Sequence, residues 1–318
     1  KMFYALANIA AANFGAFQNF VRDYGKFYSS EKEYLERYNT FVDNLERIEK
    51  DNAAHKAING EQPFGINVFA DMTPEEFSVR LMKNLTYREP SLNSETFEIT
   101  GPAAIVDWRN NGAVTPVKDQ GQCGSCWAHS ADEALESFEH IQLGHSLQKL
   151  SVQQCTACTY SYNGCNGGWP HDAYTAGVAN RGGIDSDASY PYNIPTAGTC
   201  KFGSGKADAP VANDSGYKNV AKGQLQSNLN SNGPLSVCVA ADSWQTYRSG
   251  VLSTCPGQVD HCVQAVGYNS GNSPPYWIVR NSWGTGWGVQ GYIYLDMSVN
   301  NGDICHIQEY MTYPIMSK

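Results

Sequence analysis

The sequence predicts an α+β protein built in two parts, because helical patterns dominate the early chain and strand patterns the late chain. Before residue 145, apolar residues recur at steps of three and four, which is typical of helices. From about Ser236 onward they occur in short runs that are typical of strands. The ten cysteines all lie at or after Cys123, so the two parts are expected to be stabilised by different chemistry.

The composition is that of a globular protein. Its 318 residues are 17% charged and 12% aromatic, and the net charge of −9 disfavours nucleic acid or an anionic membrane as a partner. No stretch approaches the roughly 20 apolar residues of a membrane span. Dense cysteines and the glycosylation acceptors Asn84 and Asn213 favour the secretory pathway. The mildly apolar start, Met2 to Ala12, fits either a secretory signal remnant or a first helical turn.

The first hundred residues contain two helix start signals. Ser30 and Glu33 match a capping box, and Thr73 precedes Pro74 at a first helical position. The apolar face of the first helix is formed by Tyr34, Tyr38, Phe41, Leu45 and Ile48. Between the helices, the alternation over residues 64–71 predicts a short strand. Residues 86–104 lack periodicity and are expected to form an exposed, cleavable linker.

The second part is predicted to begin with a helix that starts at Ser125 or Cys126 and ends near Gly144. The apolar face of this helix is formed by Ala128, Ala131, Leu135, Phe138 and Ile141. Strands are expected at residues 237–240, 263–268, 276–280 and 291–296.

Cys126 is the leading candidate for a reactive residue, because a thiol at a helix N-terminus is favoured as a thiolate by the dipole and the free N–H groups. A thiolate nucleophile needs a proton carrier, and His261 can fill that role if a third group holds its orientation. Asn281 is preferred to Asp260 as that group, since adjacent strand residues point to opposite faces. Gln120 can donate its side-chain amide to an oxyanion.

The segment Gln120 to Trp127, Gln-Gly-Gln-Cys-Gly-Ser-Cys-Trp, resembles the papain family of cysteine proteases, in its cathepsin L-like branch. The resemblance extends over nearly the whole chain. The long helix signature of the family's propeptide is matched at Glu33, Arg37, Phe41, Asn44, Ile48 and Asn52. The second propeptide motif is matched at Gly65, Asn67, Phe69 and Asp71. The resemblance implies an inhibitory propeptide with signal remnant and linker over residues 1–101, and a peptidase over residues 102–318.

A papain-like fold has a helical half and a β-barrel half, with the catalytic pair across the cleft between them. The resemblance makes Cys126 the nucleophile and His261 the general acid and base. It makes Asn281 the orienting residue under Trp283, and Gln120 the oxyanion donor. The implied reaction is hydrolysis of peptide bonds through a thioester, without a cofactor or a metal. The chain is expected to be a monomeric zymogen that its own propeptide inhibits, activated at acidic pH in a lysosome, a digestive vacuole or the extracellular space.

The resemblance also assigns a substrate site and disulfides. Gly167 and Gly168 form the wall that pairs with the substrate backbone. The residues assigned to the main pocket are Trp169, Pro170, Cys238, Val259, Cys262 and Tyr310, and Asp260 and Trp283 are further substrate-binding residues. The implied disulfides are Cys123–Cys165, Cys158–Cys200 and Cys255–Cys305. A tyrosine ring on the pocket floor predicts a preference for medium aliphatic side chains.

The remaining cysteines are Cys155, Cys238 and Cys262. A bridge between Cys238 and Cys262 needs α-carbons within roughly 7 Å, and free thiols are the expectation. His129 stands where the family usually has phenylalanine and is expected to be buried and hydrogen-bonded, and Val289 is a second departure. The other histidines are expected at the surface, namely His55, His140, His145, His171 and His306.

Three other functions compete with this interpretation. Cys123-x-x-Cys126 and Cys155-x-x-Cys158 resemble the halves of a zinc site or a redox pair, but neither explains His261 or the N-terminal motifs. A family member that binds without cutting would lack a catalytic residue, and all are present. An exopeptidase would carry an inserted loop, and residues 165–200 contain no obvious insertion. An endopeptidase is therefore favoured.

Overall fold

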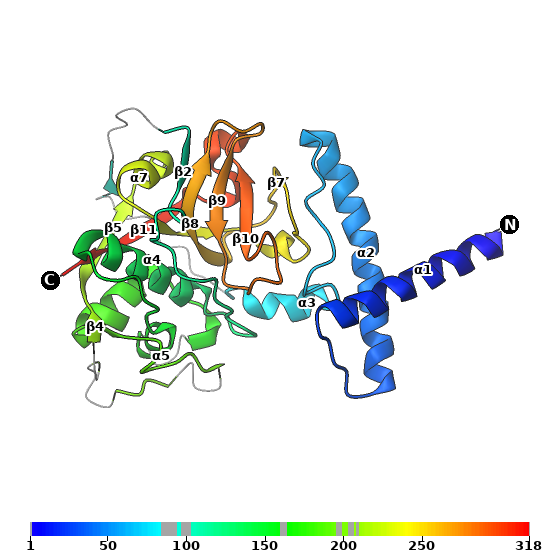
Figure 1. The fold of residues 1–318 in the computed structure, drawn as a ribbon, viewed down its shortest axis with the longest axis horizontal. Helices are drawn as coiled ribbons and strands as arrows, with labels where there is room; N and C mark the ends of the chain where they lie inside the picture. The colour runs from blue at the N-terminus through cyan, green and yellow to red at the C-terminus, as the bar shows by residue number, and fades with distance from the viewer. Residues whose placement is uncertain are drawn as a thin grey trace.

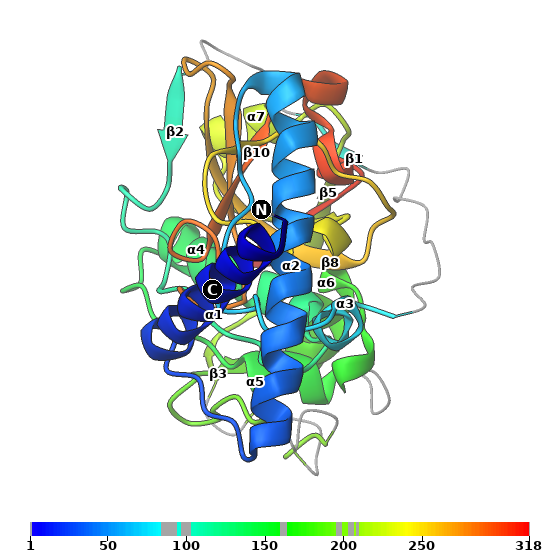
Figure 2. The same cartoon turned by 90° about the vertical axis from the view of Figure 1, so that its right-hand side faces the viewer.

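In the computed structural model, a mainly helical N-terminal segment docks against a larger α+β part (Figure 1). The structure describes residues 2–83, 94–96, 103–159, 164–194, 199–202, 207 and 210–317. The helices of the N-terminal segment are α1 (Met2–Asp23), α2 (Glu31–Asn59) and α3 (Pro74–Phe77). α1 crosses the outer side of α2 (Figure 2), and the two helices pack through a cluster that includes Phe17, Phe20 and Phe41.

The predicted start of α2 is confirmed at the N-cap Ser30, whose hydroxyl accepts from the Glu33 N–H. The Glu33 carboxylate accepts from the N–H and the hydroxyl of Ser29, so its half of the capping box is displaced by one residue. In α3 the capping box between Thr73 and Glu76 is complete.

The strand predicted over residues 64–71 is wrong. Phe64 makes a single bridge with Tyr247, and the chain turns over residues 68–72. The Asn67 side chain holds this segment by donating to the carbonyls of Gln245 at 2.8 Å and Tyr247 at 2.9 Å. The alternation in the sequence instead reflects side chains that pack in two directions. Phe64 and Val68 join the core of the larger part, whereas Ile66 and Ala70 pack against α1 and α2.

The first helix of the larger part is confirmed as α4 (Cys126–Leu143), which ends at Gly144 in the left-handed conformation. The other helices of this part are α5 (Val152–Cys158), α6 (Pro170–Asp172) and α7 (Leu225–Ser231). α4 is buried along most of its length, because one face packs on the sheet and the other on the remaining helices.

The main sheet has the strand order β1-β5-β11-β6-β8-β9-β10-β7, with β2 paired to β8. Its strands are β1 (Ser94–Glu95), β2 (Ile105–Asp107), β5 (Asp214–Val220), β6 (Leu235–Val239), β7 (Val251–Leu252), β8 (His261–Asn269), β9 (Tyr276–Arg280), β10 (Tyr292–Asp296) and β11 (Tyr310–Met316). A small second sheet pairs β3 (Ile184–Asp185) with β4 (Pro210–Ala212). The four predicted strands correspond to β6, β8, β9 and β10.

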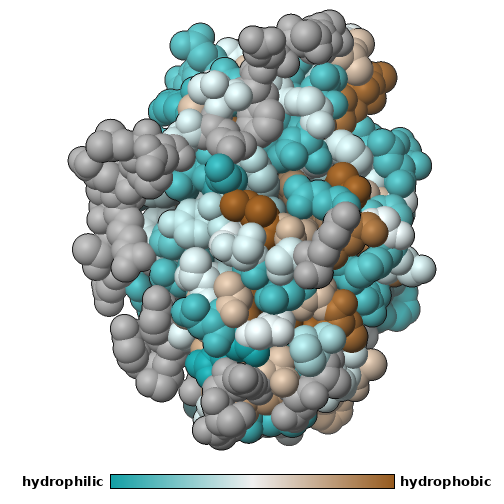
Figure 3. All heavy atoms as spheres, turned by 90° about the vertical axis from the view of Figure 1, so that its left-hand side faces the viewer, coloured by the Kyte–Doolittle hydropathy of each residue, from teal (hydrophilic) through white to brown (hydrophobic). Residues whose placement is uncertain are grey.

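Most of the predicted linker, and the acceptor Asn84, lie outside the described residues. Within the linker, β1 pairs in parallel with Asn219 and Val220 of β5. None of the described helices is both long and apolar enough to cross a membrane. On the face turned away from the N-terminal segment, hydrophobic residues occur in small groups between hydrophilic ones (Figure 3).

Candidate active site

Cys126 is the first residue of α4 and is fully buried. The backbone N–H groups of Cys126 and Trp127 at the start of the helix, and of Cys262 on β8, lie close enough to the sulfur to oppose the rise of its pKa. The helix terminus and these N–H groups all favour a negative charge on the sulfur. The thiol therefore occupies the position that the sequence predicts for it.

His261 is the first residue of β8, directly before Cys262. Its Nε2 lies 2.8 Å from Asn281 Oδ1, and the Trp283 ring lies 4.6 Å from the imidazole ring. Because an amide oxygen only accepts, Nε2 carries the proton in this contact. Nδ1 is buried and has no hydrogen-bond partner among the described residues, which leaves it free for proton transfer. Asp260 instead accepts the Ala241 N–H at 2.7 Å.

Gln120 binds a carbonyl of the N-terminal segment. Its side-chain amide donates to the carbonyl oxygens of Arg80 and Cys123, both at 2.7 Å. Its Oε1 accepts from the Ser282 hydroxyl at 2.8 Å, which fixes the orientation of the amide. The Gln120 amide, which the sequence predicts as a donor to an oxyanion, thus donates to a backbone carbonyl of the N-terminal segment.

Leu81 and Met82 continue this segment through the site, and both are buried. The Met82 N–H donates to the Asp260 carbonyl at 2.7 Å. A Cβ added to Gly167 would lie 3.2 Å from the Met82 Cβ, and one added to Gly168 would lie 2.7 Å from the Trp127 ring. The two glycines therefore allow both the chain in the cleft and the indole behind it to approach closely.

One wall of the predicted pocket is set by strand register. Cys262 on β8 pairs with Cys238 on β6, and Cys238 pairs with Tyr310 on β11. Paired residues on neighbouring strands share a face, so the three side chains form one row. The Tyr310 ring packs 4.8 Å from that of Trp169. Of the other residues assigned to this pocket, Pro170 is buried at the start of α6, and Val259 packs partly buried against the core.

Residues 102–315 match the family model described as papain family cysteine protease, and residues 17–77 match that of the cathepsin propeptide inhibitor domain. Digestive cysteine proteinase 2 of Homarus americanus is 41% identical, with 97% of this chain and 96% of that protein covered. A solved recombinant stem bromelain precursor is 33% identical with a TM-score of 0.83, covering 96% of this chain and 100% of that one. Digestive procathepsin L 3 of Tenebrio molitor larval midgut is 34% identical with a TM-score of 0.78, covering 95% of this chain and 99% of that one.

The chain belongs to the papain family of cysteine proteases. It is a zymogen, since a cathepsin propeptide inhibitor domain precedes the peptidase in the same chain. The fold is papain-like with a helical N-terminal propeptide, as the sequence predicts.

Burial in the closed site favours the neutral forms of Cys126 and His261. Burial raises the pKa of the Cys126 thiol to about 12, against the lowering effect of the Cys262 and helix N–H groups. Burial lowers the pKa of His261 to about 4, against the raising effect of Asn281. Both groups are therefore neutral in the zymogen between these values. The thiolate predicted from the helix N-terminus is not the state of the closed site, because water is excluded from it.

The propeptide also docks on peptidase residues 245–253, which we call the docking loop. Gly65 N–H donates to the Thr246 carbonyl at 2.8 Å, and Arg248 N–H donates to the Pro63 carbonyl at 2.8 Å. Further along α2, Asn59 donates to the Ser253 hydroxyl at 2.6 Å. These contacts, together with those of Asn67, bind the propeptide to a surface separate from the Cys126 sulfur.

The sequence indicated that this segment inhibits, but not which residues reach the site or the docking loop. Arg80 and Met82 bind Gln120 and Asp260 through main-chain atoms, which any residue type carries. His55 was expected at the surface, but it is 1% exposed between α2 and the docking loop. The residue types of Arg80 and Met82 give no signal of these contacts. For His55, the only signal is its position three residues after Asn52 of the helix motif.

Four disulfides are present, and the three implied by the resemblance are among them, namely Cys123–Cys165, Cys158–Cys200 and Cys255–Cys305. The fourth joins Cys238 to Cys262, so the expectation of free thiols there is wrong. It failed because sequence alone does not give the pairing of β6 with β8. Cys126 and Cys155 are free and buried.

The bridges also exclude the zinc interpretation, because Cys123 and Cys158 are not available as thiolate ligands. Within the described residues, no group of three or more His, Cys, Asp or Glu side chains could hold a metal ion. Four disulfides fit a chain that folds in the oxidising secretory pathway.

His129 is buried as expected, and its Nδ1 lies 3.1 Å from the Ser125 carbonyl. Its ring packs edge-on against Tyr192, whose hydroxyl lies 2.6 Å from Ser125 Oγ and donates to the Gln120 carbonyl at 3.1 Å. The histidine in place of phenylalanine thus supports the loop before α4. Nothing in the structure explains Val289.

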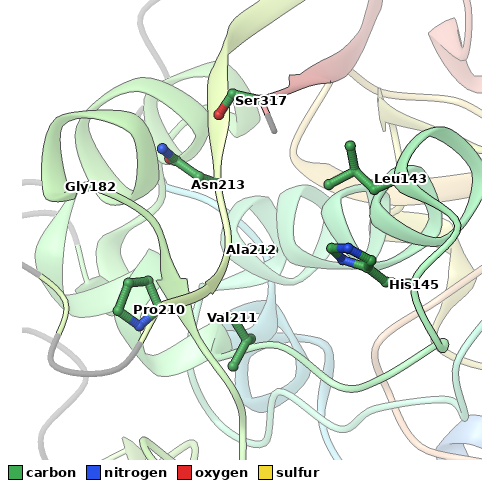
Figure 4. Close-up of a pocket in the computed structure, with 8 residues that line it drawn as sticks. All are labelled: Leu143, His145, Gly182, Pro210, Val211, Ala212, Asn213 and Ser317. Atoms are coloured by element: carbon green, nitrogen blue, oxygen red, sulfur yellow. The ribbon is translucent and has the colours of Figure 1, made fainter.

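A separate pocket of about 470 Å³ lies at the other end of α4, between Leu143, His145 and residues 210–213 (Figure 4). At 1.5 Å per residue, Leu143 lies roughly 25 Å along the helix from Cys126. Neither Cys126 nor His261 is among the described residues that line this pocket.

Proposed function

We propose that the chain is the precursor of an endopeptidase with Cys126 as nucleophile. His261 is the general acid and base, Asn281 holds its orientation, and Gln120 donates to the oxyanion. The observation that carries this assignment is the bond from the Gln120 amide to the Arg80 carbonyl, because that oxygen stands in for the carbonyl oxygen of a substrate.

The reaction begins once the propeptide has left and water enters, when the thiol proton moves to His261. The sulfur then attacks the substrate carbonyl carbon, and the Gln120 amide and the Cys126 N–H stabilise the oxyanion. The imidazolium protonates the amine as the C–N bond breaks, which leaves a thioester. Water attacks the thioester while His261 takes its proton, the C–S bond breaks and the acid leaves.

Maturation removes the propeptide by a cut in the linker, leaving a chain that begins near Gly101 to Ala104. Two observations support this boundary. The family match of the peptidase begins at residue 102. Ala103 is tied to the peptidase, since its N–H donates to Asn230 Oδ1 at 3.1 Å and its carbonyl accepts from the Tyr268 hydroxyl at 3.0 Å. The chain before Ala103 can therefore be cut without loosening the fold.

The substrates are proteins and peptides cut at internal bonds, and the enzyme acts as a monomer. The absence of an obvious insertion between Cys165 and Cys200 supports internal cleavage, since it leaves both ends of the cleft open. The compartment is a lysosome, a digestive vacuole or the extracellular space. Digestive relatives and the acidic activation expected of this zymogen support that range.

Acidification of the purified zymogen tests the mechanism. Wild type is expected to process itself and to cleave a fluorogenic peptide that is blocked at both ends, which an exopeptidase cannot use. Cys126→Ala is expected to fold, to remain unprocessed and to show no turnover. Cys155→Ala removes the other free, buried thiol and is the matched control that keeps activity. A thiol-directed epoxide is expected to modify Cys126 alone. Substantial turnover by Cys126→Ala would refute the assignment.

A further inference from the structure

The bridge between Cys238 and Cys262 lies directly beside the catalytic pair. Cys262 follows His261 in β8, and both bridge residues are buried. Their α-carbons are 3.9 Å apart, as expected for the closely spaced kind of cross-strand pair in an antiparallel ladder. In such a pair the two N–H groups point away from the partner strand.

The outward-pointing amide of Cys262 has a particular target. On the other side of β8, the pairing with β9 begins only at Gln264 and Arg280, so β9 has no paired residue opposite Cys262. The Cys262 N–H instead faces the Cys126 sulfur, where it favours the charged form of the thiol. The other two backbone donors to that sulfur belong to α4 itself. Cys262 is therefore the donor that reaches the sulfur from the β half of the enzyme.

His261 and Cys262 point to opposite faces of β8, because side chains alternate along a strand. The bridge thus fixes the strand from the pocket face, while the imidazole extends from the other face toward Asn281. β6, at the other end of the bridge, pairs with both β8 and β11 in the interior of the sheet. The start of β8 is consequently joined by a covalent bond to β6, a strand that has hydrogen-bonded partners on both sides.

We propose that the Cys238–Cys262 bridge is a positioning element for the nucleophile. The bridge holds the Cys262 amide against the Cys126 sulfur, and it keeps His261 in its place at the start of β8. The proposal rests on the proposed function of Cys126. Opening the bridge removes the covalent anchor of β8, lengthens the bond from the Cys262 amide and leaves the thiolate with the helix donors alone. The thiolate then forms only at higher pH.

The test measures the rate at which iodoacetamide alkylates Cys126 in the processed enzyme between pH 4 and pH 9. A trace of wild-type enzyme processes every variant, so the assay does not depend on the variant's own activity. In Cys238→Ala/Cys262→Ala, the midpoint is expected to rise by about half to one pH unit, which lowers the rate about three- to tenfold at pH values well below the midpoint. A profile that coincides with that of wild type overturns the proposal.

Cys158→Ala/Cys200→Ala is the matched control. Its bridge spans 42 residues, against 24 for Cys238–Cys262, so removing either one releases similar chain entropy in the unfolded state. The control is expected to lower thermal stability while leaving the alkylation midpoint unchanged. An equal shift in both variants means that general loosening, and not positioning, sets the midpoint, and this too overturns the proposal.

A second measurement covers the case in which the double variant does not fold. A phosphine opens the bridge in the processed wild-type enzyme, giving two thiols from the disulfide and a phosphine oxide whose oxygen comes from water. The phosphine is removed by gel filtration, and mass spectrometry identifies which bridges are open. Molecules with the Cys238–Cys262 bridge open are expected to show the same rise in the midpoint of Cys126 alkylation, and an unchanged midpoint refutes the proposal. Because alkylation does not require peptide hydrolysis, failure here is distinct from failure of the proposed function.

Discussion

Protonation of His55 is predicted to help release the propeptide in acid. His55 lies on α2, where its Nε2 accepts the N–H of Ser253 in the docking loop at 2.8 Å. Its Nδ1 donates to the Glu61 carbonyl at 3.2 Å. These contacts fix the neutral tautomer with its proton on Nδ1. A second proton on Nε2 would face the Ser253 N–H, so the bond between propeptide and peptidase would be lost.

The direction of the pH effect follows from the environment of the imidazole. Burial lowers the pKa of His55 below its ordinary 6.5, and the Glu61 carbonyl and the carboxylates of Glu61 and Asp296 only partly oppose this. A released propeptide exposes the imidazole and restores the ordinary value, so the released form binds the proton first. The contribution of His55 to docking is complete above pH 6.5, and it is lost as the pH falls through the lower value of the docked state.

The magnitude follows from the contact that is lost. Leaving a buried N–H such as that of Ser253 without an acceptor costs about 1–3 kcal/mol, which corresponds to a factor of about 5 to 150 in an equilibrium constant. His55→Leu removes the acceptor at every pH and is expected to open the zymogen by that factor at pH 7.5. His55→Gln keeps an amide oxygen at a similar distance from the backbone but does not titrate, so it is expected to open less than the parent at pH 5.

The assay places these substitutions in the Cys126→Ala zymogen and measures propeptide cleavage by a trace of mature wild-type enzyme. Because the same enzyme cuts every variant, its own pH dependence cancels in the ratio of variant to parent. That ratio is expected to change with pH for both His55 variants and to stay constant for His145→Gln, an exposed histidine in the pocket at the far end of α4 from Cys126. A constant ratio for His55→Gln between pH 4.5 and pH 7.5 would show that His55 does not titrate during release.

Three further predictions follow from contacts already described. The Asp71 carboxylate accepts from Lys26 Nζ and the Tyr28 hydroxyl, both at 2.8 Å. Hydrogen bonds to a charged group contribute about 1.5–3 kcal/mol each. Asp71→Asn weakens both bonds and is therefore expected to release its propeptide at higher pH than wild type. A variant as resistant to acid as wild type, in a gel assay of processing, would contradict this role. Asn281→Ala is expected to lower kcat about 10- to 150-fold without abolishing it, since it removes one hydrogen bond to the His261 imidazole. An unchanged kcat would remove Asn281 from the proposed mechanism. Tyr310 closes the row on the pocket wall, so a library varied two residues before the cut is expected to favour valine and leucine by about 1–3 kcal/mol over phenylalanine and arginine. Tyr310→Ala should shift that preference toward phenylalanine, and if it does not, the assignment of β11 to the pocket is wrong.

The sequence predicted those parts of the molecule in which residue type itself determines the structure or the chemistry. The N-cap Ser30, the left-handed Gly144 and the helix start at Cys126 each depend on a side chain, or on its absence. The partnership of His261 with Asn281 was preferred to one with Asp260 because strand residues alternate, and the 2.8 Å contact agrees with that choice. In these cases a physical rule connects one residue to one position.

The sequence failed where structure depends on which segments become neighbours. The bridge between Cys238 and Cys262 requires the pairing of β6 with β8, and residue types along either strand do not specify it. His55 has the polarity of a surface residue, and its burial follows from the docking loop that covers α2. Residues 64–71 alternate like a strand, yet side-chain hydrogen bonds from Asn67 replace the pairing that a sheet would supply.

The propeptide recognises the peptidase largely through main-chain groups. Asn67 binds the carbonyls of Gln245 and Tyr247, His55 binds the Ser253 amide, and Met82 binds the Asp260 carbonyl. Every homologous peptidase presents the same groups wherever its loop keeps this path, whatever side chains it carries. The separated propeptide is therefore expected to cross-inhibit related peptidases in the same compartment. A peptidase could escape such inhibition by a proline at the position of Ser253, which would delete the N–H that His55 requires.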